Sequence, residues 1–538
     1  MTPMIDRSMP RARGSLAIAA FALLANTAIA RAQQPSDSPS PGSPDAQPAP
    51  ASPEAAPAPA APPSVPAAPP ADLSKGEPAP AALAATTGSA PTSWYTRAPL
   101  TVGVGEGAQR WTVTFFGFVE ADYISDTTRS YNDAIGSALV ARNDTYQGTV
   151  GRTQFSMRNT RLGLAFSAPA MGGIRSSAVL EGDFFGNQPA SPPNISESSY
   201  YDSPTFRIRH AYLKLQSDIV DVVAGQTYDV FGWQNYFFPC TAEFLGLPNM
   251  VFSRDPQLRI SKTFGADGPV SVDIAVAAVR PGQRDSQIPD GEGGLRLSVN
   301  GWKGITTPGN VGTVAMPLSI GVSGLVRQFK VDAFTPPPTQ TSNRVMGWGF
   351  SVDALIPVIP ADNANDRNNR LTLTGSFVMG TGIADLMNTG GGARFPTLPN
   401  PAQQNPPPVY TGDVDNGLVT FDTLGVLHTI NWYAFKAGLQ YYLPGDTRLI
   451  FSANYTQSHS NNMGKLFFAG GAEIELLGTI ADTSRYADAN LFFDLTPAVR
   501  LGISGQYTEV EYLAQPQFAD GIQKPHNIRG MGQAVYVF

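Results

Sequence analysis

The sequence predicts an all-β protein: a sixteen-stranded antiparallel β-barrel that spans a membrane over residues 111–538, preceded by a disordered segment rich in Pro and Ala. Three observations predict this class. From Trp111 onward apolar and polar residues alternate with a period of two, as in strands with one apolar face. The links between the predicted strands are alternately short and long. Only 15% of the residues are charged, yet no apolar run after residue 30 is long enough for a membrane-spanning helix.

The first thirty residues have the three parts of an export signal. Arg7, Arg11 and Arg13 give a basic start, "SLAIAAFALLA" is a short apolar centre, and "AIA" at Ala28–Ala30 fits a cleavage site. "ARA", ending at Ala32, is an alternative site. We therefore predict a signal peptide at 1–30 and an exported protein.

Residues 31–110 are the predicted linker and lead-in to the barrel. The stretch "PAPASPEAAPAPAAPPSVPAAPPA" offers too little apolar area to form a core, and its prolines favour an extended chain. The simplest role is a passive tether in the periplasm. The alternative is a spacer that contacts the cell wall or another periplasmic partner.

Sixteen segments of the remaining chain have the length and alternation of strands. In "WTVTFFGFVEADY", for example, Trp111, Phe115 and Tyr123 share one face, and Glu120 and Asp122 share the other. The predicted strands are 111–123, 152–166, 173–184, 205–215, 221–228, 256–264, 269–279, 294–302, 316–328, 344–355, 369–380, 430–442, 447–457, 484–495, 499–511 and 526–538. Their inward and outward faces can exchange at a bulge, which we expect within 154–166.

The links decide between a soluble sandwich and a membrane barrel. Several links after even-numbered strands are short ("QSDIVD", "ADGP", "PGD", "TPA"), whereas those at 124–151, 229–255 and 381–429 are long. Bacterial outer-membrane barrels have an even strand number, short periplasmic turns and long outer loops. We expect the last strand to close on the first, so that Phe538 is fixed in the wall.

Several segments resemble one family of such barrels. "RNTRLGLAF" (158–166), "LEGDFFG" (180–186), "FRIRHAYLKL" (206–215) and "VVAGQTYDVFG" (222–232) are similar to those of the DcaP-like trimeric porins, and the resemblance extends over about 111–538. It implies a homotrimeric channel of the bacterial outer membrane for small anionic solutes, dicarboxylates among them. The Pro/Ala tract stands where the family often has a coiled-coil segment, so no role of that segment is carried over.

Charged residues on the inward faces are the candidate selectivity residues, because a barrel of this size encloses an aqueous lumen. Guanidinium groups suit carboxylates, since they stay charged and bind in a bidentate manner. The predicted pore-lining residues are Arg161, Arg175, Arg207, Arg209, Arg259 and Arg296, with Asp229 and Glu243 from the long link. Two readings stay open: a net basic constriction that prefers anions, or a mixed pore in which acids such as Glu181 and Asp183 cancel the arginines.

The aromatic stretch 227–256 is expected to fold into the lumen, because an exposed loop of that length would be more polar. No catalytic motif is found: the four histidines are scattered, and "GVGEGA" matches no phosphate-binding loop. We expect no enzyme activity, no cofactor and no metal site. With a net charge of −7 and no basic tract, we expect no nucleic-acid partner. The alternatives to an anion-preferring porin are a general or phosphate-type porin with weak selectivity, and a structural barrel that only anchors the linker in the outer membrane.

Overall fold

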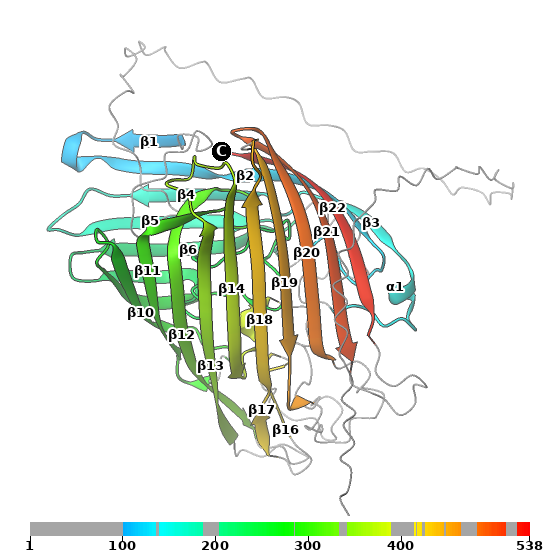
Figure 1. Cartoon of the computed structure of the whole chain (residues 1–538). Coiled ribbons are helices and arrows are strands. Elements are labelled where there is room, and N and C mark those ends of the chain that lie inside the picture. Colours follow the sequence, from blue (N-terminus) through cyan, green and yellow to red (C-terminus); the bar gives the residue numbers. More distant parts are fainter. Residues whose placement is uncertain are drawn as a thin grey trace, which may run out of the picture. The chain divides into compact units, whose positions relative to one another are not determined.

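The computed structural model describes residues 100–135, 139–186, 204–283, 286–332, 342–388, 414–415, 417–421, 426–445, 448–463, 481–512 and 524–538. The predicted signal peptide and all but the last residues of the predicted linker lie outside this set. Within it, no helix has the length and apolar character needed to cross a membrane. Eighteen strands of the described chain form one antiparallel sheet (Figure 1).

This sheet closes into a barrel with sixteen positions in its wall. β1 lies outside the ring, and β3 and β4 pair with successive parts of β2, so that together they fill one position. The strands of the sheet are β1 (Leu100–Val104), β2 (Trp111–Asp126), β3 (Arg152–Ser156), β4 (Arg161–Ser167), β5 (Arg175–Asp183), β6 (Arg207–Gln216), β7 (Asp221–Tyr228), β9 (Arg254–Phe264), β10 (Val270–Val279), β11 (Asp290–Thr306), β12 (Val314–Asp332), β13 (Ser342–Ile359), β14 (Arg370–Thr381), β18 (Asn431–Tyr442), β19 (Leu449–His459), β20 (Ala481–Thr496), β21 (Val499–Tyr512) and β22 (His526–Val537). All sixteen predicted strands are confirmed.

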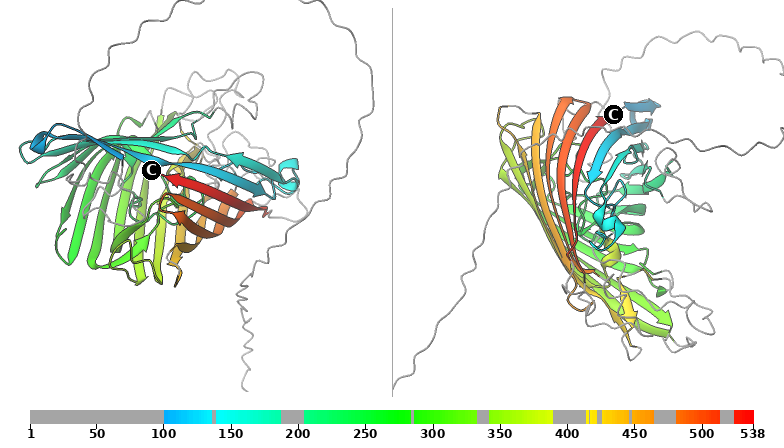
Figure 2. Two further views of the ribbon diagram at one scale, coloured as in Figure 1. Left: turned by 90° about the horizontal axis from the view of Figure 1, so that it is seen from above. Right: turned by 90° about the vertical axis from the view of Figure 1, so that its right-hand side faces the viewer.

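The barrel closes between its first and last strands. β22 pairs antiparallel with β2 from Phe118↔Val537 to Asp126↔Arg529, and these two strands lie side by side in Figure 2 (right). Phe538 exchanges two further backbone hydrogen bonds with Gly117, at 3.0 and 3.2 Å. The prediction that the chain's last residue is fixed in the wall is therefore confirmed.

The two faces of the wall follow the predicted alternation. On β2, Trp111, Val119 and Tyr123 are exposed on the outer face, whereas Glu120 and Asp122 are buried on the inner face. The apolar outer faces form the surface that meets lipid. The expected change of parity lies between β3 and β4: Phe155 and Leu162 both face outward although seven positions separate them, because a turn at 157–160 interrupts the wall.

β1 is a strand that the sequence analysis missed. It pairs with β2 from Leu100↔Phe115 to Val104↔Trp111, along the edge that β22 leaves open because β22 pairs only from Phe118 onward (Figure 1). The predicted lead-in to the barrel thus ends in regular structure. The signal was weak, because five residues with two glycines beside them give little alternation.

The remaining elements are short; η2 lies between β1 and β2, and the others belong to the long links. They are η2 (Gly107–Gln109), α1 (Tyr146–Thr149), β8 (Met250–Val251), η4 (Ala384–Leu386), β15 (Met387–Asn388), β16 (Val419–Phe421) and β17 (Leu427–Thr429). β8 pairs with β15, which ties the link after β7 to the link after β14. Phe231, Ile383, Leu418 and Ile430 form part of a buried apolar cluster that these links share with the inner wall.

Candidate functional site

The link between β7 and β9, residues 229–253, folds into the barrel, as the sequence predicted. Phe231 and Leu247 are completely buried. The Gly232 amide donates to Ser323 Oγ on β12 at 2.8 Å, and Thr241 Oγ1 donates to Asp488 on β20 at 2.7 Å. We call residues 229–253 the inner loop. Because it contacts strands on opposite parts of the wall, it divides the lumen.

The inner loop covers one part of the wall and leaves another accessible to solvent. From β10 round to β22, inward side chains such as Ser323, Asp353 and Lys436 are no more than 5% exposed. On β4 to β9, by contrast, Arg175 is exposed and the side chain of Arg207 is 30% exposed. Inward side chains that reach solvent, Arg175 and Arg207 among them, therefore lie on β4–β9, the wall in which the sequence analysis placed most of its arginines.

Four guanidinium groups and two carboxylates meet on this wall. Arg207 binds Asp183 with two hydrogen bonds of 2.9 and 2.7 Å. Arg209 binds Glu181 at 3.0 Å and Asp183 at 2.9 Å. Arg209 is only 1% exposed, so its charge is paired below the surface. In these pairs Glu181 and Asp183 neutralise part of the positive charge of the wall, as in the alternative of a mixed pore.

Arg161 and Arg254 complete this group, which we call the arginine cluster (Arg161, Arg207, Arg209, Arg254). Leu162 pairs with Gly182, so Arg161 lies next to Asp183 in the ladder. Its guanidinium donates to the backbone oxygen of Phe244 at 3.2 Å and to Asn159 at 3.3 Å. Neither acceptor is charged. Among the described residues, no carboxylate lies within ion-pair distance of Arg161.

Arg254 is held by aromatic rings instead of acids. Its guanidinium lies 4.9 Å from the ring centre of Phe252 and 5.8 Å from that of Tyr228. Tyr228 also contacts Arg209, at 3.5 Å from its hydroxyl, so the two arginines share one ring. Within the described chain Arg254 has no acidic partner, and its buried Nη1 has no acceptor. The four arginines of the cluster and their two carboxylate partners, Glu181 and Asp183, together carry a formal charge of +2.

Arg254 is one of the charges that the sequence offers from the aromatic stretch 227–256, but it is absent from the predicted pore-lining set. It stands two positions before Pro256, outside the predicted strand 256–264, at the end of the aromatic stretch. The structure extends β9 back to Arg254, and Tyr228 pairs with it across β7 and β9. The signal that could have found it is the run of aromatic residues around a single cation.

The other predicted arginines lie apart from this cluster. Arg296 is buried against Asp273, at 2.5 Å, and under the ring of Tyr236, 3.4 Å from its centre. Arg259 faces the accessible lumen and donates to the backbone oxygen of Tyr228 at 3.4 Å. Arg175 is exposed near the short-link end of β5. Arg175 and Arg259 have no carboxylate within ion-pair distance among the described residues, so they add to the positive charge along this wall.

The two predicted acids of the inner loop fix its position. Asp229 is 2% exposed and accepts hydrogen bonds from the amide of Asp255 and the side chain of Gln257. Glu243 is 4% exposed and accepts from the amide of Ile135 at 3.2 Å. Both carboxylates are therefore buried in contacts of the inner loop, Asp229 against β9 and Glu243 against the link after β2.

Burial raises the pKa of Glu243 to about 7. The nearest cation, Arg529, lies 3.9 Å away and opposes this shift. Its effect is limited because Arg529 already binds Asp126 with hydrogen bonds of 2.8 and 2.9 Å. Burial also raises the pKa of Asp229, with Glu292 and Asp255 as further causes.

Comparison with protein families and with curated proteins found no match. Among solved structures, the chain resembles the outer-membrane channel DcaP of Acinetobacter baumannii, with a TM-score of 0.54, 17% identity, and coverage of 81% of this chain and 100% of that one. An anion-selective porin from Comamonas acidovorans has a TM-score of 0.42 and 12% identity, over 80% of this chain and 100% of that one. OprB of Pseudomonas putida has the same TM-score and identity, over 79% and 94%. The last two scores are too low to support an inference. The first shows that this chain has the fold of an outer-membrane channel.

Proposed function

We propose that this chain is a DcaP-like porin of the bacterial outer membrane, through which small hydrophilic anions, dicarboxylates among them, diffuse. We propose that it acts as a homotrimer with its short links and the Pro/Ala segment on the periplasmic side. No catalytic residue, cofactor or metal enters this proposal. The DcaP fold and the apolar outer face of the barrel support it.

One observation carries the preference for anions. On the accessible part of the lumen wall, Arg161 and Arg254 have no carboxylate partner among the described residues, although they stand beside the paired Arg207 and Arg209. Uncompensated guanidinium groups beside water attract anions and repel cations. Both side chains are partly exposed, so a carboxylate of the solute can approach them. Arg175 and Arg259 extend the positive charge along the passage.

Aromatic rings next to the arginines limit what can fit. The rings of Tyr228 and Phe252 flank Arg254, and the backbone oxygen of Phe244 accepts a hydrogen bond from Arg161. Phe252 of the inner loop and Tyr228 of β7 therefore place aromatic rings beside the arginines, and the passage suits a compact solute with charge concentrated on carboxylates. This class of solute includes short dicarboxylates.

Conductance of the purified barrel in a planar bilayer under a salt gradient tests this proposal. We expect a reversal potential that shows anion selectivity and a conductance that falls when succinate is added. A conducting pore without selectivity would leave a general porin and reject the solute class. A folded barrel that does not conduct would reject transport altogether and favour the anchor.

A further inference from the structure

The link between β11 and β12 folds into the barrel, although it belongs to the short-link end. We call residues 307–313 the inner turn. Thr307 and Asn310 are only 0% and 4% exposed, whereas Met171 and Ile219, in the short links after β4 and β6, are 82% and 79% exposed. The inner turn is therefore an internal element of the barrel, unlike these two links.

An irregularity of β11 directs the end of this hairpin inward. The register of β11 against β12 shifts between Val299 and Lys303, so residues 300–302 have no partner on β12. Extra residues of this kind bend a strand. Beyond the bend, Ile305 is buried in an apolar cluster that includes Cys240 of the inner loop. The end of the hairpin thus packs against the inner loop.

Two backbone hydrogen bonds join the inner turn to the inner loop. The amide of Gly309 donates to the backbone oxygen of Pro239 at 2.9 Å, and the amide of Thr241 donates to the backbone oxygen of Gly309 at 2.8 Å. They form a parallel bridge between Gly309 and Cys240. Gly309 has a φ of +64°, in the left-handed region that favours glycine. The joint between loop and turn therefore depends on the backbone conformation of this glycine.

The inner turn is also bound to the last strands of the chain. The amide of Thr307 donates to Gln440 Oε1 on β18 at 2.8 Å, and Asn310 Nδ2 donates to Gln533 Oε1 on β22 at 2.7 Å. The guanidinium of Arg500 on β21 donates to the backbone oxygen of Asn310. The turn therefore spans the short-link end of the barrel, from β11 and β12 to β18, β21 and β22.

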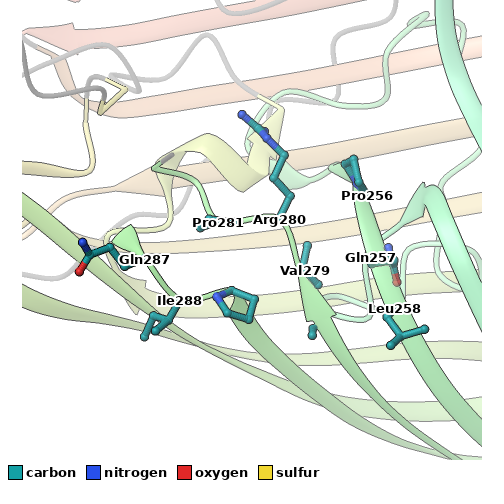
Figure 3. Close-up of a pocket in the computed structure, with 10 residues that line it drawn as sticks. Pro256, Gln257, Leu258, Val279, Arg280, Pro281, Gln287 and Ile288 are labelled. Carbon is teal, nitrogen blue, oxygen red and sulfur yellow. The ribbon is translucent and has the colours of Figure 1, made fainter. Parts of the chain in front are cut away.

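A pocket in the wall does not provide a second passage. This pocket of about 530 Å³ lies beside β9 and β10, with Pro256 and Leu258 on one side and Ile288 on the other (Figure 3). Leu258 and Ile288 are 55% and 44% exposed, and Leu258 has the outward parity of Ile260. The pocket therefore belongs to the apolar outer side of the wall and adds nothing to the lumen.

We propose that the inner turn is a second constriction of the channel, which holds the inner loop across the lumen and closes the covered part of the wall, from β10 round to β22, at the short-link end. Solute then passes only along β4–β9, beside the arginine cluster. Without this closure the passage would gain wall that carries both signs of charge, such as Asp353, Lys436 and Asp488, and its preference for anions would fall. The effect on conduction rests on the proposed function, whereas the attachment of the loop to the turn does not.

Two variants with matched controls test this inference. In the first, Asn-Gly replaces residues 308–312, which closes the hairpin in two residues and removes the bonds of Gly309 and Asn310. Its control is Gly172→Asn, which gives the same Asn-Gly turn in the exposed link after β4, where the φ of Gly172 is +59°. The second variant is Gly309→Ala, with Gly312→Ala as its control. A Cβ has open space at both positions, but of the two only Gly309 has a positive φ.

Cys240 reports on the joint directly, because it is the only cysteine of the chain and is 3% exposed. Its labelling by a water-soluble maleimide in the folded protein follows local opening of the loop. Loss of two backbone hydrogen bonds should speed labelling about thirtyfold in the first variant, which corresponds to about 2 kcal/mol. The left-handed backbone of an alanine should speed it about fivefold in Gly309→Ala, which corresponds to about 1 kcal/mol. Both controls should react at the wild-type rate.

We also expect the first variant to conduct more than the wild type in a planar bilayer, with a lower anion-to-cation permeability ratio. Labelling of Cys240 at the wild-type rate in both variants would overturn the attachment of the loop to the turn. Faster labelling with unchanged conductance and an unchanged permeability ratio would overturn the second constriction. If the first variant does not fold, Gly309→Ala decides by the same measurements. A wild-type barrel that does not conduct rejects the proposed function, and the labelling rates then still decide whether the turn holds the loop.

Discussion

Removal of the uncompensated charge in the arginine cluster should strongly reduce the anion selectivity of the pore. The substitutions are Arg161→Gln and Arg254→Gln, singly and together. Glutamine keeps an N–H donor for the backbone oxygen of Phe244, which Arg161 contacts at 3.2 Å, so the inner loop keeps this anchor. The cluster's formal charge falls from +2, given by four arginines and two carboxylates, to zero in the double variant.

The size of the effect follows from Coulomb's law. Two unit charges 4 Å apart interact by about 1 kcal/mol in water and about 4 kcal/mol near a protein surface. Both guanidinium groups are partly buried, so we use the lower figure, about 1 kcal/mol for each lost guanidinium, as the smallest effect expected. Each single variant should then lower the anion-to-cation permeability ratio about fivefold, and the double variant about thirtyfold.

The assay is the reversal potential of single channels in a planar bilayer with a salt gradient, and Arg485→Gln on the outer face is the matched control. We expect this control to behave like the wild type, because Arg485 is outside the lumen and is paired with Glu509. A double variant with native conductance and an unchanged permeability ratio would refute the role of the cluster. Higher ionic strength should weaken the selectivity of the wild type, because salt screens charges that face water.

Three further predictions concern the inner loop and the closure of the barrel. Burial raises the pKa of Glu243 to about 7 from its usual 4.5, so between these pH values the folded protein keeps a proton that the unfolded carboxyl loses. The contribution of Glu243 to the free energy of unfolding is therefore greatest below about pH 4.5 and is lost as the pH rises through 7, by about 3 kcal/mol at most. Hydrogen exchange of residues 229–253, corrected for intrinsic rates, should show less protection at pH 8 than at pH 5, and Glu243→Gln should remove this difference; equal protection at both pH values in the wild type contradicts the shift. Gly321→Val should displace the inner loop at a cost of about 1–3 kcal/mol and raise single-channel conductance, because a Cβ at this position would lie 2.9 Å from the ring of Trp233. The control is Gly324→Val, which should leave conductance unchanged because the nearest neighbour of its Cβ would be 3.6 Å away. Unchanged conductance in Gly321→Val would mean that the loop does not pack against this position. Deletion of Phe538 removes two backbone hydrogen bonds to β2 and should lower the unfolding temperature on heated gels by the equivalent of about 1–3 kcal/mol; an unchanged temperature would mean that these bonds do not hold the seam.

The strands could be predicted because alternation is a local property of the chain. The predicted segment 221–228 coincides with β7, Asp221–Tyr228, at both ends. The faces were also predictable, since a side chain's parity fixes its side of a sheet. The sequence even indicated the change of parity between β3 and β4, because "RNTRLG" interrupts the alternation.

The pairing of charges could not be predicted, because it depends on register and on contacts between distant segments. By parity alone Arg209 and Arg161 look equivalent, yet Arg209 is neutralised by Glu181 and Asp183 while Arg161 donates to a backbone oxygen of the inner loop. In the same way Asp229 and Glu243 look like pore residues, but the packing of the loop buries them.

The sequence by itself therefore determined the barrel, its strand number, its faces and the entry of the aromatic loop into the lumen, since all of these follow from periodicity and composition along the chain. Only the tertiary structure decided which arginines keep their charge toward water, that Arg254 joins them, and that the turn between β11 and β12 meets the inner loop. The physical reason is that the effect of a charge depends on its neighbours and on water, and in a barrel those neighbours come from adjacent strands and from a loop that crosses the interior.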